Sequence, residues 1–310
     1  MAKTGYLFNE EYLKHYSGSG HPESPARLKA VHNKIIENNI INDLESVSPL
    51  GDQKIVKESI LRIHSPSHYN SIIDSGAPGR IPESAVAGVL GAVSDVMEGK
   101  IKNAFCAVRP PGHHAHNNGA DCDGSGQGEG FCFFNNIAIA ARYAQDNYAC
   151  GQILILDWDY HHGNGTEWAF YSDPSVFFFS THSLFDYPAT GFDYRTGTGA
   201  GENFNLNVPL HPGAGDGEIL SAWKNKLLPA IEKLNFSPDL VLISAGFDSR
   251  KDDPLGDFNI TDSGFSKLTK IAMEIAGKNS SGKIVSILEG GYNPEGLAEA
   301  VFSHISELSG

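Results

Sequence analysis

Five short apolar runs constrain the fold of this sequence more than any other feature. Each run is rich in β-branched, leucine or aromatic residues and is too short for a helix, which is typical of strands buried on both faces of a sheet. The runs cover residues 104–108, 153–156, 176–179, 240–243 and 284–288. Stretches with helical patterning lie between them, over residues 25–38, 84–98, 136–145, 217–234, 263–278 and 294–308. This alternation predicts one α/β domain over residues 1–310, with a mainly parallel central sheet and helices on both faces.

Local signals refine this outline. Ser24 precedes Pro25, so we expect Ser24 to cap the first helix and Pro25 to occupy its first position. Residues 117–130 are rich in glycine and aspartate, and residues 187–203 in glycine and threonine, which predicts two loops.

Composition excludes several classes of protein. The formal net charge is −14, and an acidic surface repels phosphate backbones, so we expect no nucleic-acid partner. No apolar run approaches the roughly 18 residues that cross a bilayer, so we expect no membrane partner. The N-terminal residues lack the apolar segment of a secretory signal, and the four cysteines form no C-x-x-C pair. We therefore expect a cytoplasmic protein; the sequence leaves a homo-oligomer open.

Four polar segments that follow apolar runs carry His, Asp, Glu or Tyr side chains suited to a site. They occupy residues 109–114, 157–165, 244–248 and 289–292. Sites in open α/β sheets form beyond the carboxyl ends of the strands, so we expect these four segments to converge.

The second of these segments predicts a metal site. In an extended backbone Asp157, Asp159 and His161 point to one face, and two adjacent carboxylates repel each other unless a cation or a donor lies between them. Asp159 and His161 can bind an ion together with Asp248 from another run. Such a three-ligand set with an open position suits catalytic zinc (Zn²⁺), and the same ligands accept Fe(II). The alternative is that these residues cap a helix or form surface ion pairs.

Two further groups have side chains suited to acid–base chemistry beside a metal. His113 and His114 follow a Pro-Pro-Gly turn and can exchange protons near neutral pH, with Asp157 and Asn164 as orienting partners. Tyr292 follows two glycines and can donate a hydrogen bond to an oxyanion. The alternatives are a structural histidine pair and a core tyrosine.

The other histidines carry less weight. We expect His162 to point away from His161, because neighbours in a strand face opposite ways. Seven others are predicted to lie in proline-containing loop segments (His21, His64, His68) or in surface or structural positions (His15, His32, His211, His304).

Taken in order, the motifs of the chain resemble those of the histone deacetylase superfamily. They are HPESPARL (21–28), RPPGHHA (109–115), GFCFFNN (130–136), LDWDYHHGNGT (156–166), AGFDSRKDDPLG (245–256) and LEGGYN (288–293). This superfamily includes bacterial deacetylase-like amidohydrolases and acetylpolyamine amidohydrolases. The resemblance covers nearly the whole chain. It implies an arginase/deacetylase fold and zinc-dependent hydrolysis of an N-acetyl amide, with acetyl-lysine in proteins or peptides as the first substrate choice.

The resemblance also implies a role for each matching residue. Asp159, His161 and Asp248 match the zinc ligands. His113, His114 and Tyr292 match the catalytic residues, with Asp157 and Asn164 as the partners of the two histidines. A structural potassium (K⁺) site would use Asp157, Asp159, His161, Ser180 and Thr181, and a second one Phe170, Asp173, Val176 and Phe204. Gly130 and Phe131 match one wall of the acyl-lysine tunnel, Tyr187 the other, and Arg27 the arginine of an internal acetate pocket.

Two departures bear on the substrate. The loop between His114 and Phe131 is longer than in many relatives, and its composition is acidic. Leu255 occupies the place where a polyamine-selective relative carries a glutamate gatekeeper. The alternatives are an acetylpolyamine or small-amine deacetylase, a non-catalytic acetyl-lysine-binding protein, and a binuclear ureohydrolase, whose additional metal-binding aspartates are missing from DYHHG and DSRKD.

Overall fold

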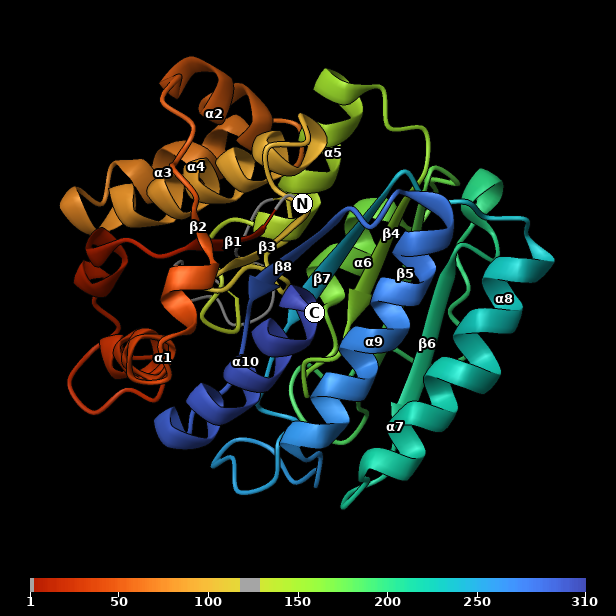
Figure 1. The fold of residues 1–310 in the computed structure, drawn as a ribbon. Helices are drawn as coiled ribbons and strands as arrows, with labels where there is room; N and C mark the ends of the chain where they lie inside the picture. Colours follow the sequence, from red (N-terminus) through yellow and green to blue (C-terminus); the bar gives the residue numbers. More distant parts are fainter. Residues whose placement is uncertain (1–2, 118–128) are drawn as a thin grey trace.

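A computed structural model describes residues 3–117 and 129–310, and most of the predicted loop at 117–130, including Cys122, lies outside the described residues. The described part contains an eight-stranded, all-parallel sheet in the order β2-β1-β3-β8-β7-β4-β5-β6 (Figure 1). The strands are β1 Thr4–Leu7, β2 Glu45–Ser46, β3 Asn103–Cys106, β4 Ile153–Asp157, β5 Val176–Ser183, β6 Asn205–Leu210, β7 Leu240–Ala245 and β8 Ile284–Leu288. The α/β class and the parallel sheet are therefore confirmed.

Helices cover both faces of the sheet. Figure 1 shows α9 and α10 side by side on one face, where α1 packs on α10 and α7 on α9, whereas α4 and α5 pack together on the other face. The helices are α1 Pro25–Glu37, α2 Gln53–Ile60, α3 Pro66–Ile73, α4 Ala77–Met97, α5 Asn136–Tyr148, α6 Asn164–Phe170, α7 Asp216–Ala222, α8 Leu228–Lys233, α9 Asp262–Asn279 and α10 Pro294–Ser309. Among the helices of the described ranges, none combines the length and the apolar character needed to cross a membrane.

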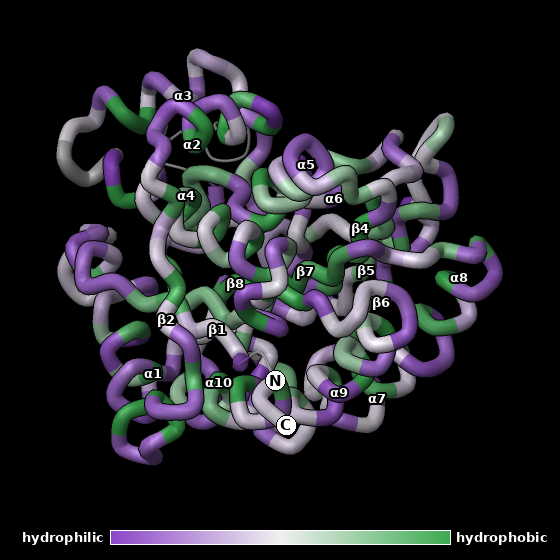
Figure 2. Tube along the Cα trace, turned by 45° about the horizontal axis from the view of Figure 1, so that its top comes forward, coloured by the Kyte–Doolittle hydropathy of each residue, from purple (hydrophilic) through white to green (hydrophobic). Residues whose placement is uncertain are grey.

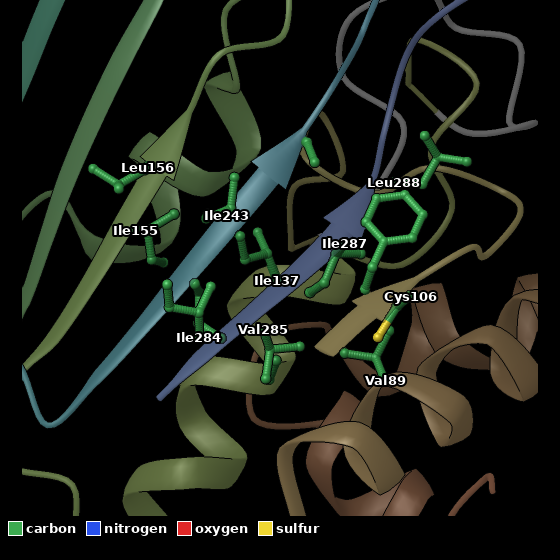
Figure 3. Packing of buried hydrophobic residues seen from close by; sticks show 14 of the residues in the cluster. Val89, Cys106, Ile137, Ile155, Leu156, Ile243, Ile284, Val285, Ile287 and Leu288 are labelled. Carbon is green, nitrogen blue, oxygen red and sulfur yellow. The ribbon is translucent and has the colours of Figure 1, made fainter. Parts of the chain in front are cut away.

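Burial on both faces of the sheet explains why the sequence predicts these strands. Hydrophobic residues run along strands such as β4 and β7, whereas the helices alternate between hydrophobic and hydrophilic residues (Figure 2). Figure 3 shows Ile284 and Val285 of β8 in the same buried cluster as Ile137 of α5 and Val89 of α4. The central strands are thus covered on both faces, and their carboxyl ends form a fixed platform.

Several sequence-based expectations need correction. The helix predicted over 217–234 is interrupted by a π-helical turn at Trp223–Leu227, just before Pro229, which has no N–H to donate to the preceding turn. Ser24 precedes α1 but makes no side-chain capping hydrogen bond. The loop predicted around His68 is wrong, because Ser65 caps α3 and Pro66 begins it. Residues 187–203 do form the predicted loop, with one short 3₁₀ turn.

The order of the strands positions the candidate site. The four strands whose carboxyl ends carry the polar segments are β3, β8, β7 and β4, and they are consecutive neighbours in the sheet. The four segments therefore emerge next to one another, although up to about 180 residues of chain separate them.

Candidate active site

Asp159, His161 and Asp248 come together beyond the ends of β4 and β7. One ligand atom from each of the three side chains lies within 4.8 Å of the other two. His161 Nδ1 is 3.2 Å from Asp159 Oδ1 and 3.0 Å from Asp248 Oδ2. The backbone N–H groups of Tyr160 and Gly290 each donate a 2.8 Å hydrogen bond, to Asp248 Oδ1 and to Asp159 Oδ2 respectively. The two carboxylates are therefore held in place with oxygen atoms aimed at a common point.

Two glycines make room for this arrangement. A Cβ atom on Gly246 would lie 1.9 Å from Asp159 Oδ2, and one on Gly290 would lie 2.1 Å from Asp248 Oδ2. Both distances are far below van der Waals contact, so any other residue at either position would displace a carboxylate.

The electrostatics of this set suit a cation. Both aspartates are buried, and burial together with the charge of Asp159 raises the pKa of Asp248. Burial alone would lower the pKa of His161, but hydrogen bonds and charges from Asp159 and Asp248 raise it to about 10. Two buried carboxylates beside one imidazole leave excess negative charge that a divalent cation would neutralise. The oxygen and nitrogen donors fit zinc or Fe(II).

The paired histidines lie beside this set with different partners. His113 Nδ1 is 3.0 Å from Asp157 Oδ2, His114 Nδ1 is 2.7 Å from Asn164 Oδ1, and the two rings are 4.1 Å apart. Burial alone would lower the pKa of His113, but the charges of Asp159 and Asp157 raise it to about 10. Burial, followed by the charges of His113 and His161, lowers the pKa of His114 well below its usual value. The structure thus favours one charged and one neutral imidazole.

Tyr292 reaches the site from the turn after β8. The turn is held by Asp253, whose Oδ2 accepts hydrogen bonds from the backbone N–H of Tyr292 at 2.6 Å and of Asn293 at 3.2 Å. Burial raises the pKa of the Tyr292 phenol, so its hydroxyl stays protonated and able to donate. The Arg27 guanidinium lies 4.9 Å from the centre of the Tyr292 ring, a cation–π contact that fixes the ring.

Aromatic rings flank the site. The Phe131 ring lies 5.8 Å from that of Tyr292, and the Tyr187 ring lies 5.0 Å from that of His114. A Cβ atom on Gly130 would lie 2.3 Å from His114 Cδ2, so Gly130 lets the chain pass directly over the imidazole. Leu255 is 37% exposed, and its backbone N–H donates to Asp253 Oδ1 at 2.9 Å, so it sits on the segment that also holds the tyrosine turn.

Arg27 is buried behind the tyrosine. Its Nε donates to the Gly291 carbonyl, its Nη2 to the Glu289 carbonyl, and its Nη1 to Glu23 Oε1 at 3.1 Å. Glu23 also binds Arg109 through both carboxylate oxygens, at 2.6 and 2.7 Å. Burial would raise the pKa of Glu23, but the two arginines lower it to about 2.

The residues predicted for potassium fall into two groups around β5. Ser180 pairs in register with Asp157, and Thr181 Oγ1 donates to the Asp157 carbonyl at 3.5 Å. In the second group the Asp173 carboxylate is occupied, because Oδ1 accepts from Ser175 and Oδ2 pairs with Arg142. Asp173 could therefore serve a cation only through its backbone carbonyl. The other members of the two groups are Asp159, His161, Phe170, Val176 and Phe204.

Sequence reasoning missed several residues that hold the site. Glu289 Oε2 accepts from the backbone N–H of Gly112 at 2.6 Å and of His113 at 3.2 Å, and thereby fixes the turn before the paired histidines. Burial raises the pKa of Glu289 to about 7. Asp253 and Glu23 were missed for the same reason as Glu289. Asp253 and Glu289 contact backbone groups, which no spacing reveals, and Glu23 joins Arg27, four residues on, to Arg109, 86 residues away. Their position inside the family-like motifs was the available signal, HPESPARL for Glu23 and the segments after β7 and β8 for Asp253 and Glu289.

The other histidines named in the sequence analysis are placed as follows, with His32 half-buried and stacked on the Phe8 ring. His162 is buried away from the three-residue set, with Nδ1 2.8 Å from Thr190 Oγ1. His15 and His304 are buried, whereas His211 is exposed. His21 packs edge-on against the Phe131 ring at 4.5 Å. His64 and His68 are buried and make hydrogen bonds to backbone groups near the site.

The chain is similar in sequence to one family of known proteins. The histone deacetylase domain family matches residues 79–308. A probable deacetylase of Archaeoglobus fulgidus is 34% identical, with 94% of this chain and 82% of that protein covered. Histone deacetylase 5 of Arabidopsis thaliana is 36% identical and histone deacetylase 9 of Homo sapiens 32% identical; each alignment covers 99% of this chain, but 49% and 34% of those proteins. The chain thus spans half or less of these two eukaryotic relatives.

A solved structure extends the comparison to three dimensions. The crystal structure of the HDA15 HD domain matches with a TM-score of 0.89 and 30% identity, over 99% of this chain and 90% of that one. The match extends along the full sheet and its helices, so the similarity is one of fold as well as of motif.

Proposed function

The chain belongs to the histone deacetylase family, and on that premise we propose that it is a metal-dependent hydrolase that removes the acetyl group from acetyl-lysine in proteins or peptides, with residues 1–310 as one catalytic domain. One observation carries the proposal. The set of Asp159, His161 and Asp248 lies against His113 and His114, with the Tyr292 turn hydrogen-bonded to the same set through Gly290.

We propose zinc as the ion held by these three side chains, with Fe(II) as the alternative. When bound, such a cation supplies Lewis-acid chemistry, because it polarises the acetyl carbonyl and lowers the pKa of water toward about 7. The chain itself provides the proton transfers, the oxyanion donor and the substrate contacts.

His114 is suited to be the base. The Asn164 Oδ1 atom can only accept a hydrogen bond, so the proton of His114 stays on Nδ1 and Nε2 keeps its lone pair. This nitrogen can take a proton from the attacking water and return it to the departing amine. His113 instead shares its Nδ1 with the Asp157 carboxylate, which stabilises a charged imidazole beside the developing negative charge.

Tyr292 is suited to stabilise the tetrahedral intermediate. Its protonated hydroxyl can donate to the oxyanion, and Asp253 and Arg27 hold its backbone and its ring. Phe131 and Tyr187 would flank the aliphatic part of the acetyl-lysine side chain, which suits apolar aromatic walls.

We also propose that potassium occupies the two groups around β5. In-register pairing of β4 with β5 places Asp157 opposite Ser180, with Thr181 next along β5, and the Asp173 carbonyl would be one oxygen ligand of the second group. Potassium prefers such oxygen ligands, and its loss would lower stability more than it changes the chemistry.

A substrate panel tests the proposal. The protein, loaded with zinc or with Fe(II), would be assayed on an acetyl-lysine peptide, a longer acyl-lysine peptide and acetylputrescine. We expect acetate release with the highest kcat/KM on the acetyl-lysine peptide, and one catalytic ion per chain. Preference for acetylputrescine would favour a small-amine deacetylase, and peptide binding without turnover by the metal-loaded protein would favour a non-catalytic binder. Two catalytic ions per chain would favour a ureohydrolase, and undiminished turnover by metal-free protein would contradict the mechanism.

A further inference from the structure

The aromatic wall of the candidate tunnel has an unusual backbone. Phe131 has a φ of +68°, directly after Gly130 at +50°. Glycine adopts this left-handed region freely, but a bulky aromatic residue does so only at an energetic cost, and such residues persist where the surrounding structure fixes them. The contacts that fix Phe131 are therefore informative.

Backbone hydrogen bonds close the turn itself. The Glu129 N–H donates to the Cys132 carbonyl at 3.0 Å, and the Cys132 N–H donates back to the Glu129 carbonyl at 2.7 Å. This reciprocal pair defines a tight turn around Gly130 and Phe131. It does not attach the turn to the rest of the molecule.

His64 provides one attachment. Its Nδ1–H donates to the His116 carbonyl at 2.8 Å, and its Nε2 accepts from the Asn135 N–H at 2.8 Å. One buried imidazole thus ties the segment that leaves the paired histidines to the segment that follows Phe131. Burial lowers the pKa of His64 to about 3, so the ring stays neutral and keeps both hydrogen bonds near neutral pH.

His68 provides another attachment one helical turn later. Its Nε2–H donates to the Phe133 carbonyl at 2.7 Å, two residues beyond Phe131. The same region adds the Ser65 N–H, which donates to the Asn117 carbonyl at 3.0 Å. Residues 64–68 therefore touch the chain on both sides of the tunnel-wall turn without touching the proposed metal ligands.

We propose that His64 and His68 are positioning residues that hold Phe131 in its left-handed conformation, and thereby set the width of the tunnel for the acyl-lysine chain. The inference rests on the proposed function for its kinetic consequence, but its structural consequence can be measured without turnover. The two histidines act through Phe131 and do not reach the reacting atoms.

The main test compares His64→Phe with His304→Phe in the full-length, metal-loaded protein. Phenylalanine keeps a ring in the core but removes both hydrogen bonds. His304 is a matched control because it is also fully buried and also uses both ring nitrogens, with Thr269 Oγ1 at 2.6 Å and Ser286 Oγ at 2.9 Å. We expect His64→Phe to raise KM for an acetyl-lysine peptide about tenfold, with kcat within about threefold, as the loss of one to two hydrogen bonds allows. His304→Phe should leave KM unchanged.

Two readouts separate positioning from general destabilisation. Hydrogen exchange should accelerate over residues 129–135 in His64→Phe but not in His304→Phe, whether or not the protein turns over any substrate. In a double-mutant cycle with Phe131→Ala, the effect of His64→Phe on KM should largely disappear, because the ring that it positions is gone.

The outcomes that overturn the inference are equally defined. The inference would be refuted if His64→Phe showed wild-type hydrogen exchange over residues 129–135. It would also be refuted if His64→Phe changed KM by the same factor with and without Phe131→Ala. If His64→Phe does not fold, His68→Phe removes the hydrogen bond to the Phe133 carbonyl and should raise KM about threefold with the same exchange pattern. If wild-type protein shows no deacetylase activity, the proposed function fails while the exchange measurement still decides the inference.

Discussion

The proposed metal ligands and the proposed tunnel wall both approach the paired histidines, yet they are carried by different kinds of backbone. Asp159 and Asp248 follow β4 and β7, which pair in register along the whole of β4, and both carboxylates are buried. Phe131 and Tyr187 come from loops; Tyr187 is 40% exposed, and Phe131 has a positive φ. The two regions are adjacent but differ in how firmly the fold fixes them.

This difference separates chemistry from specificity. Side chains at the ends of paired strands keep their geometry when loops move, and the reaction requires such fixed geometry. Loop residues can change with little cost to the sheet, and they meet the part of the substrate that varies. Substitutions in the first region should therefore remove turnover, whereas those in the second should alter KM and substrate preference.

The largest effect is expected for Asp248→Asn. The variant loses a charged ligand from a buried set, so bound metal should fall below one ion per chain and kcat/KM should fall more than the roughly 10–100-fold typical of indirect changes at metal sites. Metal analysis and acetate release measure both. Asp239→Asn is the matched control, because Asp239 lies just before the opposite end of β7 and is exposed. If Asp248→Asn kept full metal content and turnover, the strand-end ligands would not be needed for the mechanism.

Tyr292→Phe should give the next largest effect. Removing one oxyanion donor costs about 10²–10³ in kcat, while the metal content and KM should change little. Steady-state kinetics on an acetyl-lysine peptide provide the measurement. Tyr143→Phe serves as a control, because its hydroxyl is 2.9 Å from Ser94 Oγ in a buried contact between α4 and α5. Unchanged turnover in Tyr292→Phe would show that the Tyr292 hydroxyl does not stabilise the oxyanion and that the residue only lines the proposed tunnel.

Asn164→Asp should move the pH profile without abolishing turnover. A carboxylate at this position would favour the protonated form of His114 and raise its pKa, by about 1–3 units for an adjacent opposite charge. The base acts when unprotonated, so the acid limb of kcat/KM should shift to higher pH. Asn38→Asp, exposed at the end of α1, should leave the profile unchanged. An unshifted acid limb would mean that His114 is not the base.

The same contrast explains how much the sequence predicted. The runs at 153–156, 240–243 and 284–288 fall within β4, β7 and β8 because burial on both faces leaves an unbroken apolar signal. Polar residues directly after such runs, such as Asp159 and Asp248, could then be assigned to one edge of the sheet. β6 was not predicted as a strand, because it alternates polar and apolar residues and contains Pro209, which an edge strand tolerates.

Loop-borne contacts were beyond sequence reasoning for a physical reason. Asp253 acts by accepting hydrogen bonds from the backbone of the tyrosine turn, 39 residues away. His64 acts on backbone groups of two segments, at His116 and Asn135. Backbone groups carry no sequence signature, so such partners are recognised only once the turns are placed in space.

Leu255→Glu should produce the smallest effect and the clearest change in specificity. A carboxylate at this exposed position, where a polyamine-selective relative carries its glutamate gatekeeper, is expected to attract the second amine of acetylputrescine. An exposed ion pair contributes up to about 1 kcal/mol, or about fivefold in kcat/KM. The ratio of kcat/KM for acetylputrescine to that for the acetyl-lysine peptide should rise by that factor and fall back at high salt, because solvent ions screen the pair. Leu255→Gln has a similar shape without the charge and should leave the ratio near that of the wild type. The backbone hydrogen bond to Asp253 survives in both variants, so the Tyr292 turn and kcat on the peptide should be preserved. An unchanged ratio in Leu255→Glu would mean that position 255 lies outside the path of the substrate, and that specificity is set by the aromatic wall alone.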